Sequence, residues 1–430
     1  MEEHISICSV SQSFYPYIGG LARYVDALGR KFVTNGHQFK VVHFKTSETP
    51  VIDFSHGLEI TRVNIPKLGE ETLSKYMEFK ELILQVTHGE VPKEVVGYEE
   101  YLEVNSKMAK DIADAYSYKS FDVLHVHDFQ TLLLGRLLRE EYKLNIPMVF
   151  TWHVPFIAEI PEFWKNFFVS NMKYYDKVVF SIPEYTEAAI KCGLEPERIV
   201  TMPPFIDVNG YPPKEPNKAR TKYSISPDDF LIACVSRMDP RKGQEVLIEA
   251  LDEIINKHKR SSVKCLFVGN GSFSKKMSGD LRQNRVDMLK EMVESKGLSQ
   301  NVFFTGRVDD SDLYSIYHDC DVAIQPSLHE GFGLTITEAM VLGKAVIGSR
   351  IGGIPIQIED GVNGYLFEKG NSTELASKIM HLMDNRPLLD QMGQKGIETV
   401  KNKFSSEVGY SNYLKIYKDA LELHKSLSLG

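Results

Sequence analysis

The chain has 430 residues, of which 43% are hydrophobic and 25% charged, and its formal net charge is −8. This length predicts two domains, and the acidic balance argues against a nucleic-acid-binding protein. No apolar run reaches the 18 residues that a membrane-spanning helix needs, and the five scattered cysteines show no disulfide framework. Because the N-terminus also lacks a signal sequence, we expect a soluble cytoplasmic protein.

Apolar strands alternate with helices through the first half of the chain. Strands are expected at 5–10, 39–44, 121–126, 148–151 and 177–182, with helices such as 21–33 and 131–142 between them. This alternation is typical of parallel βαβ units. A charged and largely helical stretch over about 67–117 interrupts the alternation, and we interpret it as an insertion.

The second half repeats this pattern after a break. Prolines and charges predict a linker over 208–228. Strands are then expected at 230–235, 264–268, 302–305, 322–325 and 345–348. We therefore predict an α/β fold with two doubly wound Rossmann-like domains, 1–207 and 229–404, that face each other across a cleft. A final helix within 405–430 carries an apolar stripe and is expected to pack back on the first domain.

The stretch from Glu330 to Met340 is the most informative part of the sequence. A strand, a glycine loop and a helix that opens near Thr335 present free backbone N–H groups and a positive helix end, which suit a phosphate. Glu330 and Glu338 bracket this junction, and carboxylates accept hydrogen bonds from sugar hydroxyls. The combination suits a sugar nucleotide. Alternatively, Thr335 and Glu338 form a capping box, and Glu330 is an ordinary loop acid.

Other charged or glycine-rich segments also follow strand ends. Arg237 and Lys242 follow the first strand of the second domain, where a guanidinium and an ammonium suit a diphosphate. A solvated turn would also explain these two residues. In the first domain, Gly19 and Gly20 lie between a strand and a helix, an arrangement that suits an anion but that a tight turn explains equally well.

Polar residues gather at two further strand ends of the first domain. Asp128 ends one of these segments, and His153 lies beside Trp152 at the other, where an aromatic face could stack on a sugar. The alternative for His153 is a hydrogen-bonded core histidine. His125 and His127 share a strand face, but no third residue at metal-ligand spacing accompanies them, so no metal site is predicted. The convergence of these side chains on strand ends favours a functional site.

These motifs resemble those of the family-4 retaining glycosyltransferases of GT-B fold. Glu330 and Glu338 look like the two glutamates of the family's E-x7-E motif. Arg237 and Lys242 match its phosphate-binding pair, and Gly19-Gly20 matches its N-terminal glycine loop. The resemblance covers most of the chain and is poorest in the insertion.

A narrower resemblance runs from residue 122 to about 360, to the trehalose-forming glycosyltransferring synthases. The matching segments are His127-Asp128, Pro161–Trp164, Tyr175-Asp176, Pro183–Tyr185, Met202–Asp207, Val235–Pro240 and Gly331–Met340. Gln357 is part of the same resemblance, because most family-4 members carry a glutamate there and the trehalose-forming group carries glutamine.

The resemblance implies a role for each matched residue. Arg237 and Lys242 would hold the donor diphosphate, Glu338 the nucleotide ribose, and Glu330 the donor sugar. The other donor-binding residues would be Gly19, Gly20, Gly331, Phe332, Gly333, Leu334 and Thr335. His153 would bond the donor's 6-hydroxyl.

Asp128 would orient the acceptor, and we expect Trp152 and Gln357 beside it. The chain departs from the family pattern at Arg23 and Tyr24, which follow the glycine loop, and at Phe205 and Arg241, which have no match in it. The sequence therefore leaves the acceptor and the base open.

The predicted activity is transfer of glucose from ADP-, UDP- or GDP-glucose to an acceptor sugar, with retention at the anomeric carbon and free glucose as the expected acceptor, giving trehalose. No cofactor is required, and Mg²⁺ can accompany the nucleotide. The expected partners are the small-molecule donor and acceptor, and a homo-oligomer is compatible with the sequence. The alternatives are a hexosyltransferase with a lipid, polyol or other sugar acceptor, a GT-B-fold sugar-nucleotide epimerase, and a non-catalytic sugar-nucleotide-binding protein.

Overall fold

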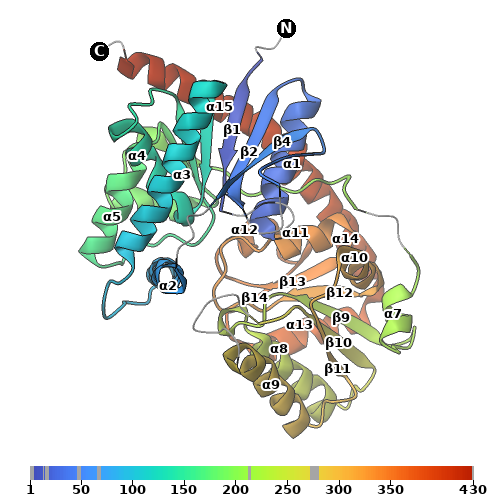
Figure 1. Ribbon diagram of the computed structural model, residues 1–430. Helices are drawn as coiled ribbons and strands as arrows, with labels where there is room; N and C mark the ends of the chain where they lie inside the picture. Colours follow the sequence, from blue (N-terminus) through green and yellow to red (C-terminus); the bar gives the residue numbers. More distant parts are fainter. Residues whose placement is uncertain are drawn as a thin grey trace. The chain divides into compact units, whose positions relative to one another are not determined.

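The chain folds into two compact α/β units (Figure 1), one formed by residues 1–204 with 406–430 and the other by residues 205–405. The computed structural model describes residues 4–12, 14, 19–45, 50–64, 69–211, 215–271 and 280–428. Each unit has its own sheet of mostly parallel strands with helices on both faces. The predicted α/β class with two doubly wound domains is confirmed.

The first unit is built on an eight-stranded sheet in the order β3-β4-β2-β1-β5-β6-β7-β8. Its strands are β1 (Ser6–Val10), β2 (Gln38–Lys45), β3 (Ile52–Ser55), β4 (Leu58–Asn64), β5 (Val123–His127), β6 (Met148–Trp152), β7 (Lys177–Phe180) and β8 (Ile199–Thr201). Only β3 runs antiparallel to its neighbour. The chain order reverses between β1 and β5, so the loops after these two strands flank the point where such sheets bind ligands.

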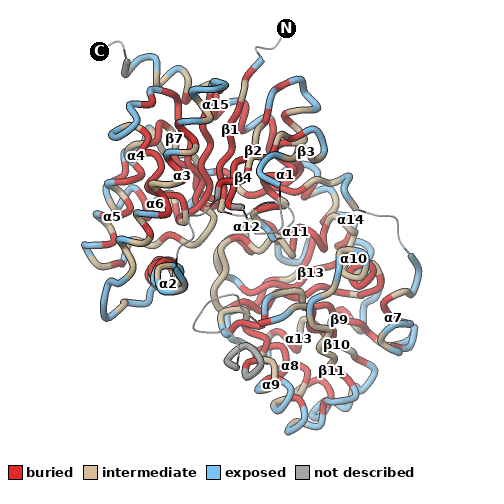
Figure 2. Tube along the Cα trace, viewed as in Figure 1, coloured by how far each residue is buried: buried red, intermediate tan, exposed pale blue. Residues whose placement is uncertain are grey.

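Helices cover both faces of this sheet. They are α1 (Gly20–Thr34), α2 (Glu70–Thr87), α3 (Tyr98–Tyr118), α4 (Leu134–Glu140), α5 (Glu162–Met172), α6 (Pro183–Lys191) and α15 (Ser406–Ser428), with the short 3-10 turns η1 (Phe129–Thr131) and η2 (Pro196–Arg198). The central strands β5 and β6 are buried along their whole length because both faces of the sheet are covered, and Figure 2 shows them beneath partly exposed helices.

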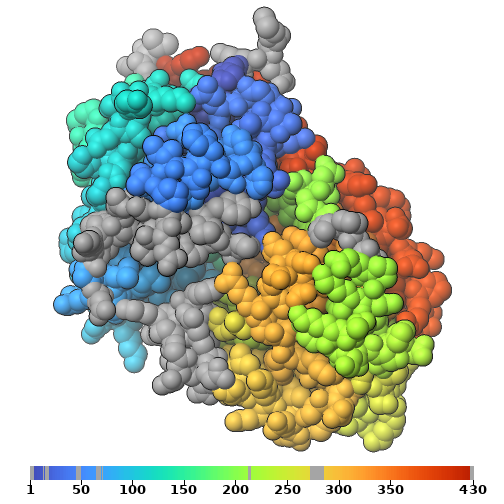
Figure 3. All heavy atoms as spheres, turned by 45° about the vertical axis from the view of Figure 1, so that its right-hand side comes forward, coloured from blue at the N-terminus to red at the C-terminus, as the bar shows by residue number. Residues whose placement is uncertain are grey.

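The expected insertion contains α2 and α3, which pack against each other. Together they lie against the segment that follows β5. The Tyr101 hydroxyl on α3 donates to the Phe129 carbonyl, and the Asn105 side-chain amide donates to the Gln130 carbonyl at 3.2 Å. Leu73 on α2 is exposed, and residues from the N-terminal part of the first unit form the blue surface in Figure 3. The insertion thus holds the turn η1 in place.

The last helix, α15, packs on the first unit. Its Tyr413 hydroxyl accepts a hydrogen bond from the Tyr24 hydroxyl at 2.6 Å, and its Tyr417 hydroxyl lies 2.8 Å from His125 Nδ1. Lys31 on α1 pairs with Glu407 at 2.8 Å. Both tyrosines are fully buried, so the apolar stripe seen in the sequence completes the core of the first unit.

The second unit has a fully parallel six-stranded sheet in the order β11-β10-β9-β12-β13-β14. Its strands are β9 (Phe230–Val235), β10 (Val263–Val268), β11 (Val302–Gly306), β12 (Val322–Gln325), β13 (Ala345–Ser349) and β14 (Gly364–Phe367). Counted within the unit this is the Rossmann order 3-2-1-4-5-6, which reverses between β9 and β12.

The helical elements of the second unit are α7 (Lys218–Lys222), η3 (Pro240–Lys242), α8 (Gln244–Asp252), η4 (Glu253–Lys257), α9 (Asp280–Ser295), α10 (Asp310–Asp319), α11 (Leu334–Val341), α12 (Ile354–Gln357), α13 (Ser372–Asp384) and α14 (Arg386–Lys403). Helix α7 lies within the stretch expected to be a linker. Its Arg220 is buried and donates to Asp321 at 2.9 Å, so this part of the stretch belongs to the second unit.

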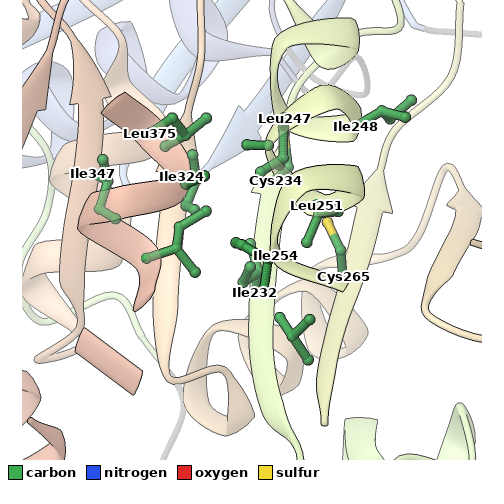
Figure 4. Close-up of a cluster of buried hydrophobic side chains, with 14 of the residues drawn as sticks. Ile232, Cys234, Leu247, Ile248, Leu251, Ile254, Cys265, Ile324, Ile347 and Leu375 are labelled. Atoms are coloured by element: carbon green, nitrogen blue, oxygen red, sulfur yellow. The ribbon is translucent and has the colours of Figure 1, made fainter. Parts of the chain in front are cut away.

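The core of the second unit forms where α8 packs on β9 and β10. Leu247 and Leu251 on α8 lie beside Cys234 and Cys265 on the strands (Figure 4). Both thiols are free and fully buried, and burial raises the pKa of Cys234 to about 12. They therefore act as small hydrophobic side chains.

Candidate active site

Two loops meet at the strand-order reversal of the second unit, one after β9 and one after β12. The Arg241 carbonyl in the first loop accepts hydrogen bonds from the backbone N–H groups of Leu328 (2.8 Å) and His329 (2.9 Å) in the second. Gly243 has a φ of +64°, and a Cβ placed there would lie 2.1 Å from the Pro326 carbonyl oxygen. Only glycine permits this close approach of the two loops.

Lys242 and Glu330 meet across these loops. The Lys242 ammonium lies 2.9 Å from Oε1 and 2.8 Å from Oε2 of Glu330. Ser327 Oγ and Gln325 Nε2 also donate to Oε2, at 2.9 Å and 3.1 Å. The Glu330 side chain is only 9% exposed. The sequence predicted both charged residues for the site, and the structure adds that they form an ion pair with each other.

The Glu330 carboxylate stays ionised despite its burial. Burial by itself would raise its pKa, but the charge and hydrogen bonds of Lys242, the hydrogen bond from Ser327 and the charge of Arg237 outweigh burial and lower the pKa below its ordinary value. Glu330 is thus a fixed hydrogen-bond acceptor at neutral pH.

Arg237, whose charge acts on Glu330, is itself exposed. Burial would raise the pKa of Asp239, but the hydrogen bonds and charge of Arg241, with a smaller effect of the Arg237 charge, lower it below its ordinary value. Asp239 accepts from the Arg241 backbone N–H and guanidinium at 2.8–3.0 Å, so Arg241 is engaged locally. Of the two arginines, Arg237 is the exposed one.

Helix α11 begins at the glycine loop, as the sequence predicted, but without the capping box. Gly333 is the N-cap residue, with a φ of +87° and no side-chain hydrogen bond to the helix. The Thr335 hydroxyl instead donates to Gln325 Oε1 at 2.9 Å, and Glu338 is buried and accepts from the Tyr317 hydroxyl at 3.4 Å. The helix start therefore offers its backbone N–H groups to an anion without a competing cap.

The Gln357 side chain supports the glycine loop through hydrogen bonds to its backbone carbonyls. Its Nε2 donates to the Phe332 carbonyl at 2.6 Å and lies 3.3 Å and 3.4 Å from the carbonyls of Gly353 and Gly333. Its Oε1 accepts from the Thr337 hydroxyl at 2.6 Å, and the side chain is 1% exposed. These contacts leave Gln357 no accessible face for an acceptor, which corrects that expectation.

In the first unit, Asp128 and His153 lie together at the carboxyl ends of β5 and β6. The His153 backbone N–H donates to Asp128 Oδ1 at 3.4 Å, and His153 Nε2 lies 3.2 Å from His127 Nδ1. Asp128 has a φ of +68°. A non-glycine residue in this conformation is uncommon and is often found where the surrounding structure fixes a functional side chain.

Burial determines the protonation states of Asp128 and His153. It raises the pKa of Asp128 to about 6, although hydrogen bonds from Phe129, His153 and Gln130 and the charge of Lys80 oppose the rise. It lowers the pKa of His153 to about 3. The imidazole is therefore neutral at neutral pH, whereas Asp128 titrates close to neutrality.

Three of the other expected residues have clear placements in the first unit. Gly19 and Gly20 stand at the start of α1, and a Cβ on Gly19 would meet nothing within 4 Å. Trp152 is fully buried, its Nε1 donates to the Pro155 carbonyl at 3.1 Å, and it packs among phenylalanine rings. Trp152 is therefore a core residue, which corrects the expectation that it contacts the acceptor.

His125 and His127 face protein groups with all four ring nitrogens. Those of His125 lie within 2.8 Å of the Tyr417 and Thr151 hydroxyls, and those of His127 within 3.2 Å of Ser9 Oγ and His153. Within the described residues, no three histidine, cysteine, aspartate or glutamate side chains gather in a way that could hold a metal ion. In the same part of the chain, none of the helices combines the length and apolar character needed to cross a bilayer.

Sequence reasoning missed three residues that the structure places at these sites. Gln325 and Ser327 hold Glu330, and Lys80 on α2 acts electrostatically on Asp128. Gln325 ends an apolar strand and Ser327 follows it two residues later, and polar side chains at such a place are a usable signal. Lys80 stands four and three residues from the apolar Tyr76 and Ile83, which marks it as a lysine on a buried helix face.

Comparison with known proteins agrees with this geometry. The family described as Glycosyl transferases group 1 matches residues 216–399, and the one described as Glycosyltransferase Family 4 matches residues 18–209. A trehalose synthase of Pyrococcus horikoshii is 31% identical over 325 residues, which are 74% of this chain and 72% of that protein. An N-acetyl-alpha-D-glucosaminyl L-malate synthase of Bacillus anthracis is 25% identical over 96% of this chain and 97% of that protein.

Solved structures show the same fold. The α,α-trehalose 6-phosphate synthase of Burkholderia multivorans superposes with a TM-score of 0.78 and covers 99% of each chain. Its sequence identity is 16%, so this likeness concerns the fold alone.

Proposed function

We propose that this protein transfers glucose from an NDP-glucose to free glucose and forms trehalose with retention at the anomeric carbon. The chain belongs to the family-4 glycosyltransferases of GT-B fold, which is the basis for this proposal. The observation that carries the proposal is the buried, ionised Glu330 beside the uncapped start of α11. A carboxylate that can accept hydrogen bonds from sugar hydroxyls thus lies beside a helix start that suits a phosphate, and a sugar nucleotide requires both. The 31% identity to a trehalose synthase supports the choice of product.

Residues of the second unit would act on the donor. The N–H groups at the start of α11 and the cations of Arg237 and Lys242 would bind the diphosphate and stabilise the charge that grows on it as the glycosidic bond breaks. Glu330 would accept hydrogen bonds from the hydroxyls of the donor sugar. Glu338, buried on the same helix, would hold the ribose.

Retention would not require an enzyme carboxylate as nucleophile. Retaining hydrolases use a carboxylate opposite the leaving group, but Glu330 is already held by Lys242. In the proposed front-face step, the acceptor hydroxyl oxygen bonds to the anomeric carbon while the carbon–oxygen bond to the diphosphate breaks. The hydroxyl proton passes to the departing phosphate oxygen. Asp128 would orient the acceptor and need not take this proton.

The test is an NMR assay with purified protein over a grid of ADP-, UDP- and GDP-glucose against glucose, a sugar phosphate, a polyol and a lipid acceptor, with and without EDTA. Trehalose with both α linkages from glucose is the expected product, and EDTA should leave its formation intact. Transfer only to another acceptor would refute trehalose formation but not glycosyltransfer. An isomerised sugar formed without acceptor would identify an epimerase, and binding without any turnover would identify a non-catalytic protein.

A further inference from the structure

Lys80 is a buried lysine that the proposed donor site does not use. It lies on the inner face of α2 with Tyr76 and Ile83 and is 7% exposed. Its ammonium lies 3.6 Å from Met77 Sδ and 4.9 Å from the centre of the Tyr76 ring. Among the described residues, no oxygen lies within hydrogen-bond distance of it and no carboxylate within 4.0 Å. A buried ammonium with only such weak partners is costly to a fold.

The helix that carries Lys80, α2, lies close to η1, the turn that follows Asp128 directly. The two charges act on each other: Lys80 helps to restrain the rise in the pKa of Asp128. Burial lowers the pKa of Lys80 to about 8, and Asp128 opposes that fall. The two groups therefore influence each other electrostatically without forming an ion pair.

Two further polar atoms of this region are buried without a hydrogen-bond partner in the described structure, the Tyr76 hydroxyl and Gln130 Oε1. Tyr76 is the residue whose ring lies under the Lys80 ammonium, and Gln130 belongs to η1 and bonds to Asp128. Unsatisfied buried polar atoms are rare in folded proteins, and their grouping with an unpaired lysine indicates a ligand site.

We propose that the α2–α3 insertion forms one wall of the acceptor site, that Lys80 binds the acceptor opposite Asp128, and that the acceptor is a neutral sugar. This inference rests on the proposed transfer to glucose and adds the residues that would bind this acceptor. One hydroxyl of a sugar ring would donate to Asp128, while another accepts from the Lys80 ammonium. Such a ligand satisfies both charges without adding a third.

The charge balance at this site disfavours a phosphorylated acceptor. Lys80 and Asp128 cancel, and His127 and His153 are neutral because burial holds their pKa values far below the ordinary value. A phosphate dianion would therefore meet one cation and one carboxylate, whereas phosphate sites usually contain an excess of positive charge. A neutral hexose fits this balance.

The test compares Lys80→Met with Lys75→Met, the same substitution on the same helix at an exposed position. Since hydrogen bonds to buried charged groups are strong, the acceptor KM of Lys80→Met should rise roughly 10- to 100-fold, and its donor KM far less. Lys75→Met should stay within about twofold of wild type for both constants. An unchanged acceptor KM in Lys80→Met, or an equal rise in both KM values, would overturn the proposal.

Thermal unfolding separates a binding role from a structural one. If Lys80 serves the ligand, Lys80→Met should unfold at the same or a higher temperature than wild type, because it removes an unpaired buried charge. It should also lose the stabilisation that glucose gives to the wild-type protein in the presence of a nucleoside diphosphate. A lower melting temperature with the glucose effect intact would show that Lys80 is structural.

The acceptor class is read from the wild-type protein with glucose and glucose 6-phosphate. A preference for the phosphate would overturn the neutral acceptor but leave glycosyltransfer intact. Conversely, a wild-type protein that forms no trehalose but is stabilised by glucose, with that effect lost in Lys80→Met, would refute the proposed activity and retain the site. The two failures are therefore distinguishable.

Discussion

Replacing Glu330 by glutamine removes the negative charge that faces Lys242 while it keeps the size of the side chain. In the native protein, the carboxylate accepts two contacts from the Lys242 ammonium and one each from Ser327 and Gln325. A glutamine retains one acceptor oxygen, and its NH₂ group meets hydroxyl, amide or ammonium donors at the other position. At least two charge-assisted hydrogen bonds are weakened by the change.

The expected loss follows from these contacts. A hydrogen bond to a charged group contributes roughly 1.5–3 kcal/mol, and about 1.4 kcal/mol corresponds to a tenfold change in rate. We therefore expect Glu330→Gln to lower kcat/KM on the order of 100-fold. Because Lys242 keeps a 17% exposed side chain, its lost partner should lower the free energy of unfolding by only about 1–3 kcal/mol.

Steady-state kinetics of trehalose formation and urea unfolding would measure both quantities. Glu368→Gln is the matched control. Glu368 also accepts from a cationic side chain, that of Arg350, but it is 65% exposed, so the loss in kcat/KM should be within about twofold. A double-mutant cycle with Lys242→Met should give a coupling free energy of about 1–3 kcal/mol. A variant Glu330→Gln that retains half of the wild-type kcat/KM, or effects that simply add in the cycle, would refute the assigned roles.

Three further predictions concern stability and are checked by urea unfolding. Gln357→Glu should lower the free energy of unfolding by about 1–3 kcal/mol, since a carboxylate would face backbone carbonyls. The control, Gln394→Glu at an exposed position, should change this free energy little. Equal effects of the two substitutions would contradict the role of Gln357 in supporting the glycine loop. Gly243→Ala should cost more than about 2 kcal/mol because its Cβ would lie 2.1 Å from a carbonyl oxygen at a φ of +64°, and Gly69→Ala, with φ −53° and open space, is its control. The unfolding free energy should fall as the pH drops below about 6.5, because His153 is then protonated in the unfolded chain, whereas its pKa in the folded protein is about 3. His153→Gln should reduce this dependence of stability on pH. An unchanged dependence would contradict a neutral, buried imidazole at this position.

The sequence predicted the strand-end positions well because that part of the site depends on local pattern. Glu330 follows an apolar strand and precedes a glycine loop, which are features that neighbouring residues report. The sequence predicted less well which side chains at a strand end point into the core. Trp152 and His153 are adjacent at one strand end, but side chains alternate between the faces of a strand, so only one of them could leave the core. The pattern did not show which.

The capping box failed for a similar reason. Thr335 and Glu338 have the required spacing, but Gly333 adopts a left-handed conformation and is the N-cap residue, two positions before the Thr335 that a capping box requires. The Thr335 hydroxyl is then free to hold Gln325, and Glu338 lies inside the helix rather than at its third position. Tertiary contacts of this kind, like those of Lys80, are not visible in the spacing of residues along one segment.

In each unit a lysine acts electrostatically on a carboxylate, but the two pairs differ in a way that assigns them different chemistry. Lys242 touches Glu330, and this contact holds the pKa of the glutamate below its ordinary value. Lys80 does not touch Asp128, and burial raises the pKa of the aspartate to about 6. Binding that depends on ionised Glu330 should therefore persist as the pH falls to 5, whereas any step that needs ionised Asp128 should weaken as the pH falls through about 6. The acceptor side of the reaction would then set the acid limb of the pH–rate profile, and the donor side would not.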